Sequence, residues 1–306
     1  MIFPLDIVFQ SGDFYNQDTS SWWLDLLNTI IGAFLGSCVT IFALYRTFRQ
    51  DKQTDEDKKI EFQNEKLRYF QSLIKSISKD LKSQIDYFKT FSDEIKADPI
   101  DLPALNFAPL NDLTSVVHKI NQEDYYHSYL AEFGREQDKI EEFREIYSFM
   151  YFFDGNITLI KERLQKAKAF DYQRQVELKD LIEKAREEAT SYLINTQLKA
   201  EQPNFVKFLN DKILEFHQNR PEETDLTYYI ENFVNKIKTE ELVEYSRNIP
   251  EAYSLILKLK SSSQNYGLIK LHNIRLAVTF EKDHELFDTE FKKLQPKTQR
   301  LNNYNS

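Results

Sequence analysis

Histidine and carboxylate pairs are the first residues in this chain whose spacing suggests chemistry. Asp124 and His127 are three residues apart, as are Glu281 and His284, so on a helix each pair would share one face. Dinuclear metal sites in helical bundles use such pairs, but they also need inward carboxylates from two further helices. The chain has no HExxH sequence, and its 49 acidic residues do not single out the missing ligands. We therefore predict no metal site and no bound cofactor.

Other catalytic signatures are also missing from the sequence. After residue 45 the only glycines are Gly134, Gly155 and Gly267, each isolated, whereas phosphate-binding loops need closely spaced glycines before a helix. No nucleophile elbow occurs. Cys38 is the single cysteine, which excludes an intrachain disulfide and a cysteine-built zinc site. We predict no catalytic residues and a protein that is not an enzyme.

One stretch stands out by its charge. No acidic residue lies between Glu251 and Glu281, and the segment SSSQNYG at 261–267 is expected to form a turn between two helices. Ammonium, guanidinium and backbone N–H groups there could bind phosphate, and a tyrosine could stack on a base. The alternative is an ordinary loop whose lysines face water. The candidate anionic ligand site consists of Lys258, Lys260, Ser262, Asn265, Tyr266, Lys270, His272 and Arg275.

An apolar segment near the N-terminus predicts a transmembrane helix. Residues 26–45 carry no charge, and at about 1.5 Å per residue they span roughly 30 Å, the thickness of the hydrocarbon core of a bilayer. We place the transmembrane helix at residues 22–45, after a short extracytoplasmic lead at residues 1–21. The lead contains acidic residues but no lysine or arginine, whereas Arg46, Arg49 and Lys52 follow the apolar segment. The N-terminus is therefore expected outside and the rest of the chain in the cytoplasm.

The transmembrane segment has a polar, small-residue face. Asn28, Gly32, Gly36 and Thr40 recur every fourth residue, and Asp25 precedes them by three. A GxxxG pair lets two helices approach closely, and amide and hydroxyl groups can hydrogen-bond between chains. The sequence thus favours homo-oligomer formation through this face. In an oligomer the same residues could line a narrow polar path with a ring of aspartates at its mouth, which would favour cations, or the helix could act only as an anchor.

The segment that follows is expected to form a charged helical stalk at residues 46–98. It contains apolar residues on alternating steps of three and four, which is the spacing of a heptad seam. This seam could make a self-associating coiled coil or could belong to one core helix of a bundle. The seam residues are Leu67, Phe70, Ile74, Ile77, Leu81 and Phe88.

The remaining chain predicts a cytoplasmic helical domain at residues 112–294, so the fold class is all-α. Pro99, Pro103 and Pro109 separate this domain from the stalk. Asp112 resembles an N-cap, Gly134 a helix stop, and the sequence DGN at 154–156 a break between helices. Helices are also expected at 171–198, from Pro203 to about 218, at 225–245 and at 250–261, with the ambiguous 268–287 stretch also helical. Residues 295–306 are expected to be a flexible tail.

In outline the chain resembles the single-pass transmembrane effectors of bacterial antiphage systems. The matching features are the acidic lead, the small-residue helix NTIIGAFLGSCVT and a large helical domain without a catalytic motif. The resemblance implies a homo-oligomer in the inner membrane that permeabilises the bilayer. It also implies a nucleotide or oligonucleotide signal that is made by a companion enzyme and acts on the cytoplasmic domain.

The sequence-based hypothesis is therefore an oligomeric effector that forms or gates an ion-conducting pore in the lipid bilayer. A membrane-tethered scaffold is the alternative, and a membrane-anchored enzyme is a third possibility. The part of the chain after residue 45 carries 40 basic and 45 acidic residues, a net charge of 40 − 45 = −5. Broad binding of double-stranded nucleic acid is thus not expected.

Overall fold

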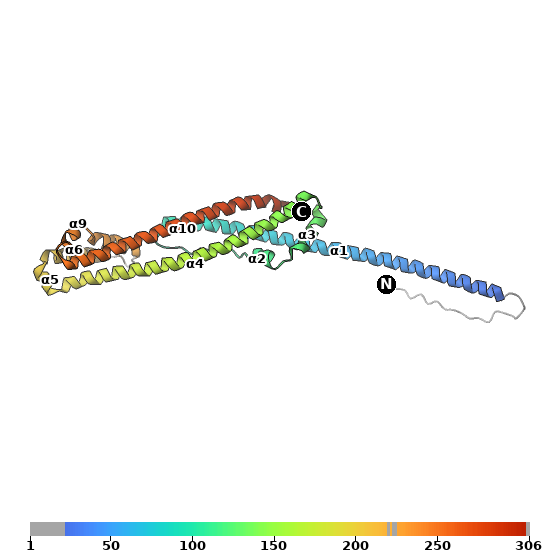
Figure 1. The fold of residues 1–306 in the computed structure, drawn as a ribbon, viewed down its shortest axis with the longest axis horizontal. Helices are drawn as coiled ribbons and strands as arrows, with labels where there is room; N and C mark the ends of the chain where they lie inside the picture. Colours follow the sequence, from blue (N-terminus) through green and yellow to red (C-terminus); the bar gives the residue numbers. More distant parts are fainter. Residues whose placement is uncertain (1–21, 219–220, 222–224, 304–306) are drawn as a thin grey trace. The chain divides into compact units, whose positions relative to one another are not determined.

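The computed structural model describes residues 22–218, 221 and 225–303, and every regular element within them is a helix (Figure 1). The all-α prediction is therefore confirmed for this part of the chain. The lead predicted at residues 1–21 lies outside the described residues. The elements are α1 (Trp22–Ala97), α2 (Asn111–His118), α3 (Gln122–Phe133), α4 (Gln137–Ile194), α5 (Thr196–Glu201), α6 (Pro203–Gln218), α7 (Leu226–Tyr229), the π-helix η1 (Ile230–Val234), α8 (Asn235–Ile237), α9 (Glu240–Tyr245) and α10 (Pro250–Asn303).

The chain divides into two compact units, one ending at Asn64 and one beginning at Glu65. The boundary falls inside α1, so the predicted stalk at 46–98 is not one structural unit. Its first part, residues 46–62, is exposed along its whole length, whereas the part after Glu65 contributes buried side chains to the second unit. The helical domain thus begins near residue 65 and not at residue 112.

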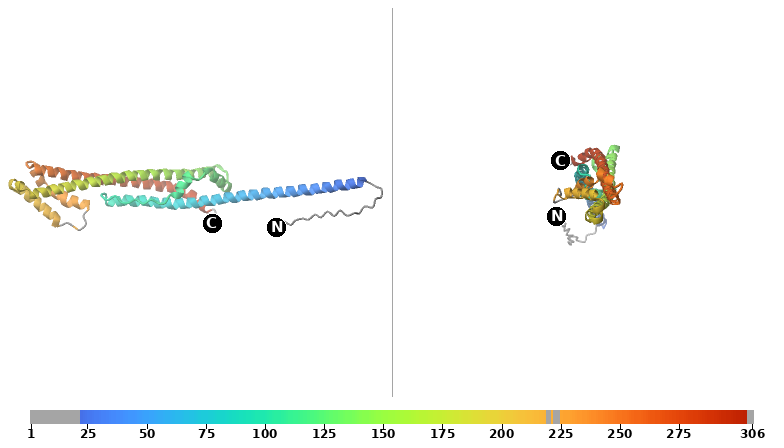
Figure 2. Two further views of the ribbon diagram at one scale, coloured as in Figure 1. Left: turned by 90° about the horizontal axis from the view of Figure 1, so that it is seen from below. Right: turned by 90° about the vertical axis from the view of Figure 1, so that its left-hand side faces the viewer.

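Two long helices, α4 and α10, form the frame of the second unit. Figures 1 and 2 show them side by side and running in opposite directions. Three polar pairs join them along their length: Glu188 with Lys258, Asp171 with Asn273, and Arg163 with Asp283. The last part of α1 packs antiparallel to α10, since Gln71 donates to the Leu301 carbonyl and Ser92 to the Ala277 carbonyl.

The second unit contains two hydrophobic cores. The first joins α1 after residue 65, the 105–117 segment, α3, the first part of α4 and the last part of α10. Aromatic contacts tie it together, with the Phe91 and Phe280 ring centroids 4.7 Å apart and those of Phe88 and Phe287 5.4 Å apart. The second core joins the last part of α4, the short elements α5 to α9 and the first part of α10.

The heptad seam lies inside the first core. All six seam residues are at most 5% exposed, and they contact helices of the same chain. Of the two alternatives for this seam, the structure therefore supports the core helix of a bundle, and the use of Leu67, Phe70, Ile74, Ile77, Leu81 and Phe88 as an oligomer interface is not supported. The physical reason is that α4 and α10 already cover the apolar face that a second copy would need.

Several predicted helix breaks do not occur. The DGN sequence lies within the 58-residue helix α4, and SSSQNYG lies within the 54-residue helix α10. Conversely, the helix expected after Asp112 is interrupted, because Asn121 caps the new helix α3 by accepting from the Glu123 N–H at 3.1 Å. Asp112 lies in the first turn of α2 and is not its cap. Gly134 ends α3 with φ of 103°, as predicted.

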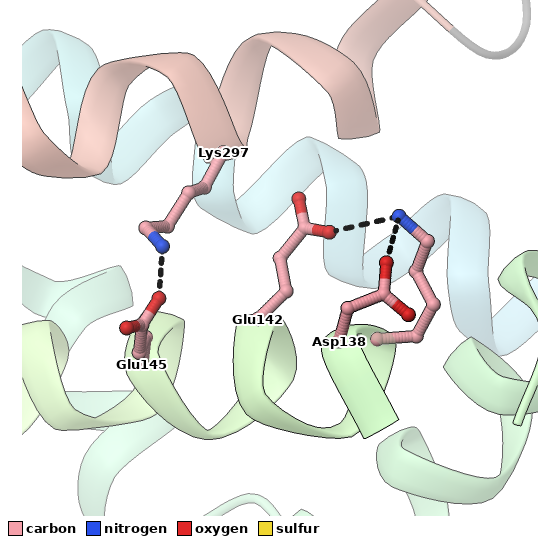
Figure 3. Close-up of polar contacts among 5 residues, drawn as sticks. Asp138, Glu142, Glu145 and Lys297 are labelled. Atoms are coloured by element: carbon pink, nitrogen blue, oxygen red, sulfur yellow. Dashed lines mark hydrogen bonds and ion pairs between the residues drawn. The ribbon is translucent and has the colours of Figure 1, made fainter. Parts of the chain in front are cut away.

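The predicted flexible tail is also wrong as far as residue 303. Helix α10 continues through Pro296 to Asn303, and Leu294, Thr298 and Leu301 are buried. Figure 3 shows Lys297 of α10 reaching Glu145 of α4 across the two helices. Leu294, Thr298 and Leu301 recur at steps of four and three residues, so they share the buried face of this helix although the stretch has little apolar content.

Candidate functional site

The candidate membrane span is the first part of α1. Among the described residues, one helix is long and apolar enough to cross a membrane, and none of its most apolar window is buried by the rest of the chain. Its large side chains are exposed, with Phe34 and Val39 each at 68% and Phe42 at 67%. Such exposure of aliphatic and aromatic side chains is suited to lipid contact and costly in water.

The assembly face of this helix consists of Asn28, Gly32, Gly36 and Thr40, with Asp25 one turn before. All five residues are exposed, so the structure brings them onto one open surface. A Cβ atom built on either glycine would meet nothing within 4 Å, which leaves the backbone open to close approach by another helix. The Thr40 hydroxyl donates to the Gly36 carbonyl at 2.8 Å, so it is satisfied within its own helix.

The predicted anionic ligand site does not form as one site. Because SSSQNYG is helical, its residues point in different directions from α10 instead of converging in a turn. Ser262 is fully buried and donates to the Lys258 carbonyl at 2.9 Å. Asn265 is also buried, and the Tyr266 hydroxyl donates to Thr227 Oγ1 at 3.1 Å.

The cations of this stretch are also distributed around α10. Lys258 is engaged by Glu188, which also accepts from Tyr192. Burial alone would raise the pKa of Glu188. The hydrogen bonds that its carboxylate accepts, the strongest from Lys258, have the larger effect and lower this pKa. Lys270 lies 4.6 Å from the centre of the Tyr266 ring, a cation–π contact that occupies both residues.

The other two cations of the stretch, Lys260 and Arg275, are exposed, and Lys260 lines an open hollow of about 420 Å³ beside residues 238–243. They lie fifteen residues apart in the sequence, about 22 Å along the helix at the standard rise per residue. The eight predicted residues therefore have separate roles in packing, pairing and solvation, and they form no single ligand pocket.

A buried polar layer that sequence reasoning missed lies between the two cores. Asp171 of α4 accepts from Asn273 of α10 at 2.8 Å and from Gln175 at 2.9 Å. The same amides hold the proline-rich connection, since Asn273 donates to the Pro99 carbonyl and Gln175 to the Ile100 carbonyl. Asp171 occupies a position that the apolar periodicity of α4 would give to a hydrophobic residue, and this signal is visible in the sequence. Its partner on α10 is not, because the sequence does not show which residue of α10 lies opposite.

Burial controls ionisation in this layer. It raises the pKa of Asp171, and the hydrogen bond from Asn273 offsets only part of the rise. Burial also lowers the pKa of His272, against the opposing charge of Asp171. The His272 ring lies 4.4 Å from the Phe170 ring, and its Nε2 atom has no hydrogen-bond partner among the described residues. His272 therefore packs as a largely neutral ring and does not act as a cation for phosphate.

A cavity of about 460 Å³ opens beside the polar layer, between residues 98–101, α4 and α7. Carboxylates of Asp98, Asp101, Glu183 and Asp225 line it, with Lys179 as the one cation among its lining residues. This lining is unfavourable to the anionic ligand that the sequence suggested.

The histidine and carboxylate pairs do not build a metal site in the described part of the chain. The carboxylate of Asp124 pairs with Lys66 at 3.3 Å, and that of Glu281 with Lys96 at 2.8 Å. Within residues 22–218, 221 and 225–303, no group of three or more histidine, cysteine, aspartate or glutamate side chains is arranged to hold a metal ion.

Comparisons with known proteins give no relative: no protein-family model, no curated protein and no solved structure matches this chain. Its function is therefore inferred from its residues and their geometry.

Proposed function

We propose that this chain is a homo-oligomeric, single-pass membrane effector whose copies assemble through the Asn28, Gly32, Gly36 and Thr40 face and form an ion-conducting pore. The observation that supports assembly is the open surface over Gly32 and Gly36, where a Cβ atom added to either glycine would have no neighbour within 4 Å. In a bilayer such a surface lets a second helix approach closely and pack its backbone against the glycines. The Asn28 amide lies on the same face and has no hydrogen-bond partner among the described residues.

Conduction follows from the polar groups of the same face. If several copies turn this face inward, the Asn28 amides and the glycine backbone line a polar path, and Asp25 forms a ring of carboxylates at one end. Such a path attracts cations. The charge asymmetry around the span supports an inner-membrane orientation with the N-terminus outside and the second unit in the cytoplasm.

The second unit is the proposed regulatory part. Helix α1 is continuous from the span into the first core, so residues of the span and of the bundle belong to one helix. The resemblance to antiphage effectors supports defence as the biological setting and a nucleotide or oligonucleotide as the class of signal. The basic residues of α10 do not converge on one pocket that such a signal could occupy.

The test is membrane depolarisation on expression of the full chain in bacteria. We expect the natural sequence to depolarise the membrane and Gly36→Leu to abolish this effect, because the added side chain fills the close-approach surface. Cys38→Leu is the matched control, since it enlarges a small residue on the opposite side of the same helix. Depolarisation that persists in Gly36→Leu would contradict the assembly face.

A membrane-tethered scaffold is the second candidate function. One observation favours it: the Thr40 hydroxyl is already hydrogen-bonded to the Gly36 carbonyl, so it needs no partner from another helix. In that case the full chain stays in the membrane fraction after alkaline extraction, but its expression leaves the membrane potential unchanged. The two measurements together separate the anchor from the pore.

A further inference from the structure

The outer surface of α10 carries an apolar and basic stripe. Its members follow each other at steps of three or four residues and are all exposed, with Tyr253 at 55%, Leu268 at 49% and Leu271 at 45%. None of its cations forms an ion pair with the described residues, and no acid lies in the stripe. The α10 stripe consists of Tyr253, Leu257, Lys260, Gln264, Leu268, Leu271, Arg275, Val278 and Lys282.

An exposed surface of α4 carries a stripe of opposite charge, which borders the cavity beside residues 98–101 and α7 at Glu183. It has four carboxylates, no cation, and two exposed apolar side chains, Tyr172 at 72% and Val176 at 47%. Asp180 and Glu183 reach Lys184 and Arg186 beside the stripe at 2.7 and 2.8 Å, in exposed pairs that contribute little to stability. The α4 stripe consists of Glu162, Gln165, Ala169, Tyr172, Val176, Asp180, Glu183 and Glu187.

The packing of α4 on α10 fixes which residues of the two stripes lie at the same height. The pairs Glu188 with Lys258, Asp171 with Asn273, and Arg163 with Asp283 show that each step forward on α10 matches one step back on α4. Counting residues between these pairs shows which residues of the two stripes lie at the same height along the paired helices. The level groups are Lys260 with Glu183 and Glu187, Gln264 with Asp180, Leu268 and Leu271 with Tyr172 and Val176, and Lys282 with Glu162.

We propose that the α10 stripe of one copy docks on the α4 stripe of a second, parallel copy. This inference rests on the proposed oligomeric membrane protein, because copies related by rotation about the membrane normal keep corresponding residues at the same height. In that arrangement opposite charges meet at both ends of the contact, and apolar side chains meet in its middle. The contact joins two different surfaces, so repeated rotation closes the copies into a ring.

Two other occupants of the α10 stripe fit less well. A two-fold pairing of the stripe with itself in copies that share one membrane orientation would bring Lys260 near Lys260 and Arg275 near Arg275, which places like charges together. An anionic lipid surface would have to attract a unit whose residues 65–306 carry 35 basic and 40 acidic side chains, a net charge of 35 − 40 = −5.

The size of the contact explains why it needs the membrane anchor. The thirty residues from Tyr253 to Lys282 extend about 45 Å along the helix, and a helix is about 10 Å wide, so each copy contributes roughly 450 Å². That area is below what stable soluble complexes bury. Anchored copies face each other at high effective concentration, so a contact of this size is sufficient among them.

Cross-linking of the full chain in membranes tests the contact. In a Cys38→Ser background, one tagged copy carries Lys260→Cys and a second, differently tagged copy carries Glu187→Cys. A short bis-maleimide should link the two copies. The matched control pairs Lys260→Cys with Asp138→Cys, an exposed acid on the same helix α4 but outside the stripe, and should give no link.

Charge reversal tests the same contact without cysteines. Lys260→Glu with Lys282→Glu should reduce the oligomeric fraction in membranes about tenfold, because like charges then oppose each other at both ends. Adding Glu187→Lys with Glu162→Lys on the same chain should restore it. All four residues are exposed, and none has an ion-pair partner among the described residues, so the bundle itself should stay folded.

The outcomes separate this inference from the proposed function. The docking of the stripes is overturned if the oligomer forms but Lys260→Cys and Glu187→Cys do not cross-link. It is also overturned if the oligomer does not recover when the second charge pair is reversed. Neither result affects the assembly of the span. A chain that stays monomeric in membranes in every variant overturns both. An oligomeric fraction that falls on charge reversal in anionic vesicles, but not in vesicles of zwitterionic lipid, would show that lipid, and not a second copy, covers the α10 stripe.

Discussion

At the scale of single residues, the buried layer around Asp171 has the most direct physical consequence. The carboxylate is 7% exposed, and it is held by two amides from different elements, Asn273 and Gln175. Each amide also binds a carbonyl of the proline-rich connection, which would otherwise carry unsatisfied backbone groups. The layer therefore fixes the register of α4 on α10 at the point where one hydrophobic core ends and the other begins.

The raised pKa of Asp171 predicts a pH dependence of stability. A carboxylate whose folded-state pKa lies above its unfolded value of 3.8 contributes stability that is present at low pH and lost as the pH rises through the folded pKa. Asp171→Asn removes this loss. The free energy of unfolding of the variant, minus that of the natural sequence, should therefore increase between about pH 4 and pH 7.

Denaturant titrations of the detergent-solubilised chain at several pH values measure this difference. Asp138→Asn, which changes an exposed carboxylate on the same helix, controls for the change in net charge. A difference that stays flat with pH for Asp171→Asn would show that burial does not govern this carboxylate.

At the scale of helices, α4 and α10 continue through sequences that usually interrupt helices. Gly155 lies inside α4, and SSSQNYG and Pro296 lie inside α10. Most helical stability in proteins comes from packing an apolar face, so a few unfavourable residues cost less than breaking the frame of two cores. Within this stretch the Ser262 hydroxyl donates to the Lys258 carbonyl one turn back, so it is satisfied inside the helix.

Two glycines offer a matched test of this explanation. Gly155→Ala should stabilise the chain by about 0.5–1 kcal/mol, because the helical glycine has open space at its Cβ position. Gly134→Ala should destabilise it by about 1–3 kcal/mol, because φ is 103° and the new Cβ would lie 2.1 Å from Glu136 Oε2. Thermal or denaturant unfolding measures both, and equal effects at the two sites would contradict the assigned backbone conformations.

At the scale of the whole molecule, the second unit extends beyond the domain that the sequence suggested. It begins at Glu65 and includes α10 to its end, with Leu301 only 1% exposed. The part of α1 at residues 46–62 has no buried side chain, and it carries Arg46, Arg49 and Lys52. A protease needs locally unfolded backbone, which is most accessible where no tertiary contact holds the helix.

Limited trypsin digestion of the full chain in detergent should therefore cut first between residues 46 and 66. The resistant fragment should retain the C-terminal residues through at least Leu301, because Gln71 and Glu145 hold that end of α10 to α1 and α4. Mass spectrometry identifies both ends of the fragment. Early cleavage at Lys297 or Arg300 would instead support the flexible tail at residues 295–306.

The sequence by itself determined the elements whose signals are local. Twenty uncharged residues predict a membrane-length helix, three prolines predict the connection after α1, and Pro203 and Gly134 mark real helix ends. The face formed by Asn28, Gly32, Gly36 and Thr40 also follows from spacing alone, because a helix repeats every 3.6 residues regardless of its surroundings.

Only the tertiary structure decided the questions that depend on partners far away in the chain. The heptad seam was compatible with a coiled coil or a core helix, and α4 and α10 of the same chain cover it. The basic stretch after Glu251 suggested one ligand site, but its continuous helix separates Lys258, Tyr266 and Arg275 around its axis. Periodicity in the sequence shows which residues share a helix face. The contact that buries the face forms between residues far apart in the sequence, such as Asp171 and Asn273.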